Sequence, residues 1–98
     1  MPHLFDPLTL RGTTFANRIW VSPMCQYSAP HGKVGQWHRA HHAAFATGGA
    51  GLIMVEATGV NPKGRISIDC PGLWSDELAE AFRPIVDFSH EMGAKMGI

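Results

Sequence analysis

The segment Ser22–Tyr27 places several chemically useful groups within six residues: a hydroxyl, a proline ring, a thioether, a thiol, an amide and a phenol. The Cys25 thiol could donate a weak hydrogen bond or act as a nucleophile, although free cysteines are also commonly buried and inert. No acid or base stands at a spacing that specifies a catalytic dyad with it. Tyr27 could be an aromatic wedge in a loop or a functional hydroxyl, since a buried phenol needs a hydrogen-bond partner.

A second stretch of interest is Glu56–Gly59, whose small residues would let a flat ligand approach the backbone. Both stretches follow apolar, β-prone runs, Arg18–Val21 and Leu52–Val55. Ligands of parallel α/β sheets and of (β/α)8 barrels bind at the carboxyl ends of the strands. These two strand exits are therefore the places where we expect a ligand.

The histidines His38, His41 and His42 have the i, i+3 and i, i+4 spacing of metal ligands on a helix. They lack the glutamate of an H-E-x-x-H motif and a third ligand at a telling distance, so we expect no metal site. We interpret His41 as a packed residue with a satisfied nitrogen, and His38 and His42 as sharing a neighbouring face. The glycines of Gly48–Gly51 precede a strand, which excludes a dinucleotide fingerprint or a P-loop.

The elements that must position these residues alternate along the chain. Strands are predicted at Leu8–Leu10 and Thr13–Phe15, forming a hairpin whose Arg11-Gly12 turn uses the glycine for a positive φ. Apolar spacing predicts a helix over Gln36–Thr47, ended by Gly48-Gly49. Its apolar face is expected to consist of Trp37, Ala40, His41, Ala44 and Phe45.

A second helical region follows Ser75, which can cap it. Because a proline deep in a helix costs about 3 kcal/mol, Pro84 predicts two helices, Asp76–Ala81 and another that starts at Pro84 and ends at Gly93. The buried stripe of the second is expected to be Ile85, Val86, Phe88 and Met92. A third strand starts at Lys95, so the order is hairpin, β, α, β, α, β, which is typical of a parallel sheet in an α/β protein.

The composition indicates a globular chain: 98 residues, 45% hydrophobic, 16% charged, with a formal net charge of +0. One domain at most fits this length. Neither a membrane helix nor a secretory signal is present, so a cytoplasmic location is expected. The two cysteines, Cys25 and Cys70, form no C-x-x-C pair, and no Lys or Arg cluster indicates nucleic-acid binding.

The sequence resembles the old yellow enzyme family, and within it the thermophilic-like subgroup, which has a cysteine after Pro-Met. The similarity runs through nearly the whole chain. It rests on these motifs: Leu4-Phe5 with Pro7, Asn17-Arg18-Ile19, Ser22 to Tyr27, Trp37-His38, Gly48 to Leu52, Val55-Glu56-Ala57, Asn61-Pro62, Gly64-Arg65-Ile66 and Trp74 to Glu77.

This resemblance implies the N-terminal part of a single flavin-binding TIM (β/α)8 barrel domain, over residues 1–98, with the hairpin capping the barrel bottom. It implies FMN as cofactor and hydride transfer from NADPH or NADH through flavin N5 to an activated alkene. By the matching motifs, Ser22, Pro23, Met24, Cys25 and Ala57 would contact FMN, and Tyr27 would face the substrate. Cys25 and Tyr27 are the residues expected to serve catalysis, Cys25 as a tuner of the flavin potential and not as a nucleophile.

The resemblance also implies that further FMN and substrate residues lie beyond Ile98. We interpret the chain as an incomplete barrel that stops at the start of its third strand and, alone, binds FMN poorly. Alternatives are a dienoyl or nitro-compound reductase of the same fold, or a split segment that only completes a partner's barrel. Related enzymes are commonly dimers or tetramers, so a homo-oligomer is expected for the full-length protein.

Overall fold

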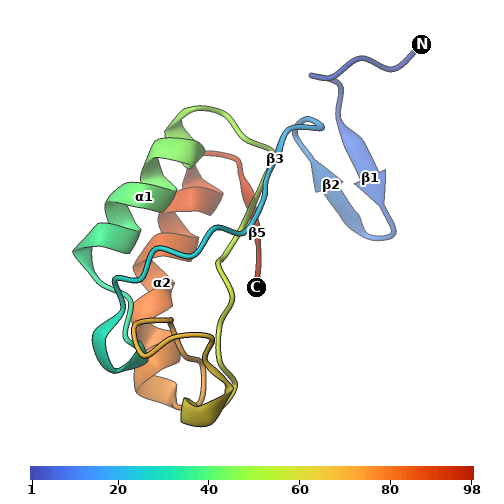
Figure 1. The fold of residues 1–98 in the computed structure, drawn as a ribbon. Coiled ribbons are helices and arrows are strands. Elements are labelled where there is room, and N and C mark those ends of the chain that lie inside the picture. The colour runs from blue at the N-terminus through green and yellow to red at the C-terminus, as the bar shows by residue number, and fades with distance from the viewer.

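The computed structural model describes residues 1–98 and has two sheets (Figure 1). The first sheet is an antiparallel hairpin of β1 (Leu8–Leu10) and β2 (Thr13–Phe15). The second has the order β3-β4-β5, from β3 (Trp20–Val21), β4 (Leu52–Met54) and β5 (Lys95–Gly97), all parallel. The predicted order of hairpin, β, α, β, α, β is confirmed.

Two helices connect the parallel strands, α1 (Gln36–Thr47) and α2 (Asp76–Glu91). Figure 1 shows both on the same side of the sheet, and they pack against each other. In a doubly wound sheet, helices cover both faces, whereas in a TIM barrel every helix lies outside the ring of strands. The arrangement of these helices is therefore that of a part of a TIM (β/α)8 barrel.

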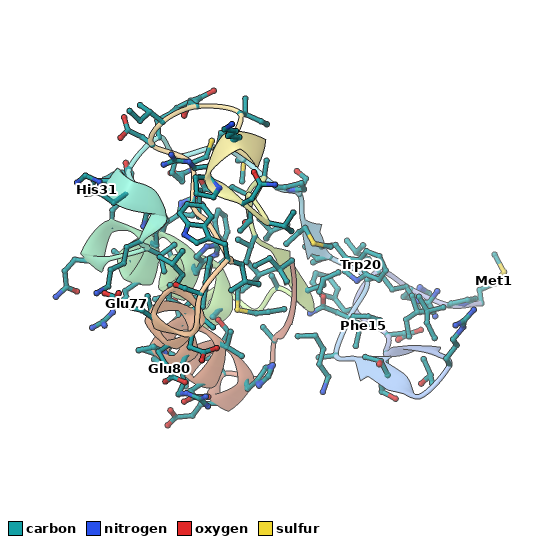
Figure 2. The ribbon with its side chains drawn as sticks, turned by 90° about the horizontal axis from the view of Figure 1, so that it is seen from below. Met1, Phe15, Trp20, His31, Glu77 and Glu80 are labelled. Carbon is teal, nitrogen blue, oxygen red and sulfur yellow. The ribbon has the colours of Figure 1, made fainter.

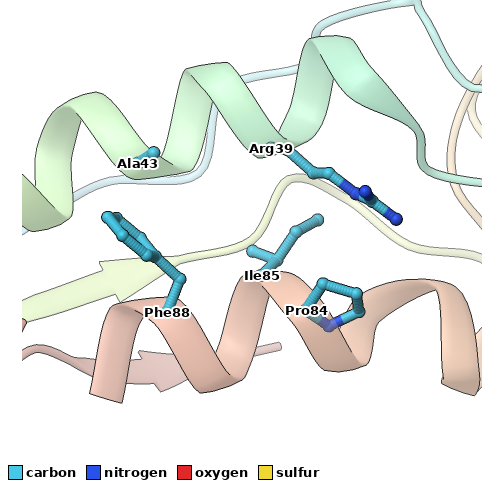
Figure 3. Close-up of a pocket in the computed structure, with 5 residues that line it drawn as sticks. All are labelled: Arg39, Ala43, Pro84, Ile85 and Phe88. Carbon is cyan, nitrogen blue, oxygen red and sulfur yellow. The ribbon is translucent and has the colours of Figure 1, made fainter. Parts of the chain in front are cut away.

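The core lies between the sheet and the two helices. One cluster joins Val34, Val55, Phe82 and Ile85, and another joins Ala46, Ile53 and Ala94. Ile53 is fully buried in the central strand, as the run of apolar residues without alternation predicts. Figure 3 shows the outer seam between the helices, where a groove of about 240 Å³ is lined by Arg39, Ala43, Pro84, Ile85 and Phe88.

The hairpin projects from the amino-terminal end of the parallel sheet and gives the molecule its long dimension of 46 Å. The rings of Phe15 and Trp20, 4.9 Å apart, mark the junction (Figure 2). The prediction for its turn was wrong in one respect. Arg11 takes the positive φ, +53°, and Gly12 does not. The first residue of the two-residue turn, and not its glycine, therefore supplies the positive φ.

The helix α1 has the predicted bounds, but its predicted apolar face was wrong. Its fully buried residues are His38, His42 and Ala46, spaced four residues apart, whereas Trp37 is 57% exposed. The reason is tertiary: the indole Nε1 of Trp37 donates a hydrogen bond to Gln26 at 3.0 Å, which holds the ring at the surface of the preceding loop. The interpretation of His41 as a packed residue with a satisfied nitrogen was wrong in its second part: the half-buried ring packs edge-on against Phe45 at 5.1 Å, but its nitrogens have no hydrogen-bond partner in the chain.

The second helical region forms one helix, Asp76–Glu91, and not the two helices that Pro84 predicts. Ser75 caps it as expected, its Oγ accepting a hydrogen bond from the Leu78 N–H at 3.3 Å. Pro84 is exposed, so the Glu80 carbonyl that has no N–H partner there can be hydrated. Of the predicted stripe, Ile85 is buried, Val86 and Phe88 are half-buried and Met92 is exposed. The sequence missed three further buried residues, Leu78, Phe82 and Ser89.

Both helices end as predicted. Gly49 and Gly93 follow α1 and α2 with φ of +95° and +91°, conformations that favour glycine. None of the helices in the structure is both long and apolar enough to cross a membrane.

Candidate functional site

The carboxyl ends of β3, β4 and β5 open onto one cleft of about 470 Å³. Most of its wall is apolar, and the two predicted strand exits meet in it, since it includes Pro23 from the first and Ala57 from the second. The full lining is Pro23, Met54, Val55, Glu56, Ala57, Thr58, Val60, Leu73 and Ile98. A cleft at this end of parallel strands is where such folds bind ligands.

The other predicted site residues lie beside this cleft in the sequence but not in its lining. Ser22 and Met24 are exposed, and Cys25 is half-buried with a free thiol. Tyr27 is 62% exposed and has a positive φ of +53°. A bulky residue in this region of backbone space is strained by about 1–2 kcal/mol, and such strain concentrates at functional sites.

Several backbone donors at the strand exits have no partner within the chain. The N–H groups of Met24, Cys25 and Ala57 donate to no protein group. Met24 and Ala57 are exposed and Cys25 is half-buried, so these N–H groups are open to solvent and free to donate to a bound ligand. Free donors around an apolar cleft therefore suit a flat, largely apolar ligand whose edge carries oxygen and nitrogen acceptors. The isoalloxazine ring of a flavin has this chemistry, so the residues present fit that group.

A buried polar network lies behind the first strand exit. Glu56, the second residue after β4, is 3% exposed, and its Oε1 accepts a hydrogen bond from the Gln26 N–H at 3.1 Å. Its Oε2 lies 3.6 Å from Nε2 of His38, which is fully buried on α1. The other ring nitrogen, Nδ1, accepts the Gly35 N–H at 3.2 Å, so a neutral His38 carries its proton on Nε2, toward Glu56.

Burial dominates the titration of this pair. It raises the pKa of Glu56, and the hydrogen bond from the Gln26 N–H opposes that rise. It lowers the pKa of His38, and the nearby His41 lowers it further. His38 is consequently neutral near pH 7, and the pair is better described as a polar contact than as a salt bridge.

Neither Glu56 nor His38 was assigned a role from the sequence alone. The available signal was a glutamate at the end of a strand flanked on both faces by apolar residues, because a carboxylate there must find partners. The structure brings together no group of three His, Cys, Asp or Glu side chains that could hold a metal ion.

A parallel sheet with both helices on one side and a cleft at the carboxyl ends of its strands are features of a TIM-barrel protein, a class that binds its ligands at that end. The sequence matches the profile of the NADH:flavin oxidoreductase / NADH oxidase family over residues 3–98. The chain belongs to this family, as the resemblance to old yellow enzymes implies.

Among curated relatives, the chain is 50% identical over 97 residues to an NADPH dehydrogenase of a Geobacillus species, covering 97% of this chain and 28% of the relative. It is 46% identical over 97 residues to the NADPH dehydrogenase of Bacillus subtilis, covering 97% and 29% of the two chains. The chain thus spans less than a third of the length of these relatives.

Comparison with solved structures supports the same family and fold. An old yellow enzyme homologue from Zymomonas mobilis superimposes with a TM-score of 0.82 at 37% identity, covering 97% of this chain and 26% of that one. Morphinone reductase superimposes with a TM-score of 0.87 at 28% identity, covering 98% and 26%. The prediction of a TIM-barrel fold is confirmed.

Proposed function

We propose that the protein carrying this chain is an FMN-dependent oxidoreductase that transfers a hydride from NADPH or NADH to an activated alkene, such as an α,β-unsaturated carbonyl compound. The observation that supports it most is the apolar cleft at the strand ends together with the free N–H groups of Met24, Cys25 and Ala57 beside it. Family membership and relatives named NADPH dehydrogenase support the flavin and the nicotinamide donor.

In this proposal the residues of the chain bind FMN and orient the substrate. FMN, when bound, carries the hydride between donor and acceptor. Ser22, Pro23, Met24 and Cys25 hold the ring system, chiefly through backbone groups, and the small side chain of Ala57 permits close approach. The exposed hydroxyl of Tyr27 donates a hydrogen bond to the substrate and holds the alkene in place, and such placement supplies much of the acceleration.

We expect Cys25→Ala to change the midpoint potential of the bound FMN. A thiol is a weak hydrogen-bond donor whose interaction strengthens as reduction adds electron density to the ring, so its loss alters the two redox states unequally. The measurement is a spectroscopic redox titration of the purified holoenzyme. Cys70→Ala is the matched control, because Cys70 is fully buried and its Sγ contacts Ser67. An unchanged potential in Cys25→Ala removes the tuning role.

The function itself is tested on the complete gene product. We expect it to purify yellow or to bind added FMN, and to oxidise NADPH or NADH when given a cyclic enone, with the saturated ketone as product. Residues 1–98 expressed alone are expected to bind FMN poorly and not to turn over, because β5 pairs on one side only and leaves the sheet open. A complete protein that binds no FMN contradicts the proposed function. Tight FMN binding by residues 1–98 alone contradicts only the expectation that this segment binds FMN poorly.

We further propose that the full-length protein is a homo-oligomer. If the protein reduces a nitro compound or a dienoyl thioester but not an enone, the fold and the proposed cofactor still hold. The proposed substrate class is then replaced by the class of the compound that is reduced.

A further inference from the structure

The buried pair of Glu56 and His38 lies directly behind the segment that carries Cys25. We propose that this pair, with Gln26 and Trp37, positions the Met24–Cys25 backbone against the flavin. These are positioning residues, since they act through the segment and not on the reacting atoms. The inference rests on the proposed function and adds to it the residues that hold the first strand exit in place.

Glu56 joins the two strand exits. Its Oε1 accepts the Gln26 N–H from the first exit, and the residue that follows it in the chain, Ala57, lies in the cleft lining at the second exit. Because Glu56 is 30 residues from Gln26 in sequence, this bond fixes the two exits relative to each other. A hydrogen bond to a buried carboxylate is stronger than one between neutral groups.

The side chain of Gln26 extends the same network in two directions. Its Nε2 donates to the Met24 carbonyl at 2.9 Å, and its Oε1 accepts from Trp37 Nε1 at 3.0 Å. The N–H groups of Met24 and Cys25 have no partner in the chain, so these bonds through Gln26 are what orders the segment. The two free N–H groups are left for a ligand.

His38 supports Glu56 from behind. Its Nδ1 accepts the N–H of Gly35 at the start of α1, which fixes the ring, and its Nε2 lies 3.6 Å from Oε2 of Glu56. The helix α1 thus supplies both His38 and Trp37 to the loop that precedes it. Well-packed apolar residues would usually be at least as stable as a buried ionisable pair. A role in holding the Cys25 segment explains why polar groups occupy these positions.

The test uses the complete gene product and two readouts other than activity: the rate of Cys25 alkylation by iodoacetamide in the flavin-free protein, and the dissociation constant for FMN. Cys70 is fully buried and does not interfere. Since the lost hydrogen bond is worth about 1.5–3 kcal/mol, Glu56→Leu is expected to weaken FMN binding about tenfold or more. We expect its Cys25 alkylation to accelerate about fivefold or more, because release of a bond of this size frees the segment.

Glu56→Gln keeps an acceptor oxygen for the Gln26 N–H and is expected to change either value less than about twofold, since the bond is retained. Trp37→Phe removes one exposed, neutral hydrogen bond, which is worth about 0.5 kcal/mol, the low end of the usual range, so an intermediate effect of about twofold to threefold is expected. Glu77→Gln is the control, because Glu77 is an exposed partner of Lys33 and does not line the cleft.

Unchanged alkylation and FMN binding in Glu56→Leu and Trp37→Phe overturn the inference. Equal effects in Glu56→Leu and Glu56→Gln also overturn it, because they would reflect charge and not the hydrogen bond. If Glu56→Leu does not fold, Trp37→Phe decides, since Trp37 is at the surface. A wild-type protein that binds no FMN refutes the proposed function, while the alkylation rates still test whether the network orders the Cys25 segment.

Discussion

Replacing Gly72 with alanine is expected to destabilise the protein by about 3 kcal/mol or more, the upper range for overpacking a site that cannot relax. An alanine Cβ at this position would overlap the indole ring of Trp74. The backbone of Gly72 cannot move away, because its N–H donates to the Gly32 carbonyl at 2.8 Å and it forms a parallel bridge with Gly59. The Arg65 guanidinium lies over the same ring, 5.3 Å from its centroid, and restricts its movement.

Urea unfolding followed by circular dichroism measures this effect. Gly12→Ala is the matched control, because nothing lies within 4 Å of the Cβ it would add and its φ is not positive, so a change below about 0.5 kcal/mol is expected. A double-mutant cycle identifies the cause: in a Trp74→Leu background, Gly72→Ala should cost much less. The same large cost in both backgrounds would show that the indole is not the obstacle.

Gly72→Ala would affect the cleft at the strand ends only indirectly. Gly72 fixes the loop between β4 and α2, and Val60 and Leu73 of this loop line the cleft. The close approach of Gly72, Gly32 and Trp74 is invisible in the sequence, where each is one of many turn-forming or aromatic residues. Only the three-dimensional arrangement distinguishes Gly72 from Gly12.

The parts of the fold that local chemistry dictates could be predicted from the sequence. The central strand is a run of apolar residues, Leu52–Val55. Alternating polar and apolar residues would have predicted a half-exposed strand, whereas an unbroken apolar run predicts a strand that is buried on both faces. Gly49 and Gly93 follow the two helices because the chain takes a positive φ at these positions, which glycine adopts easily. Alternating strands and helices then leave few topologies other than a parallel sheet.

The errors arose where tertiary packing outweighs local preference. Pro84 is tolerated inside α2 because Phe82 and Ile85 bury the opposite side of the helix in the core and water can reach the carbonyl that has no donor. In α1 the large aromatic Trp37 was assigned to the core, yet its indole is at the surface and two histidines occupy the interior. The spacing of apolar residues predicts that α1 is a helix. It does not predict which face of the helix packs against the sheet, because histidines can also serve as core residues.

For the site, the strand exits were predictable and the network behind them was not. The rule that ligands bind at the carboxyl ends of strands selected the stretches Ser22–Tyr27 and Glu56–Gly59, and the structure places Pro23 of the first and Ala57 of the second in one cleft. The partnership of Glu56 with Gln26 and His38 joins three separate segments of the chain, and no spacing in a single sequence encodes it.

His42 should make the protein lose stability in mild acid. It is 3% exposed, neither ring nitrogen has a hydrogen-bond partner, and burial, with smaller contributions from His41 and His38, lowers its pKa from 6.5 to about 4. Between these values the unfolded chain takes up a proton that the folded chain refuses, so the free energy of unfolding falls as the pH falls from 6.5 toward 4 and is unaffected by this group above 6.5. At about 1.4 kcal/mol per pKa unit, the loss reaches up to about 3 kcal/mol.

His42→Leu is expected to remove this part of the pH dependence and to raise stability near pH 7 by about 1–2 kcal/mol, because an apolar side chain replaces two unpartnered polar atoms. The measurement is urea unfolding at several pH values between 4 and 8, and the difference between the wild-type and variant curves isolates His42 from Glu56, whose raised pKa acts in the opposite direction. His3→Gln, at an exposed position, should leave the curve unchanged. Parallel curves for wild type and His42→Leu would mean that His42 reaches solvent or a partner in the folded protein, and the burial argument would then be wrong.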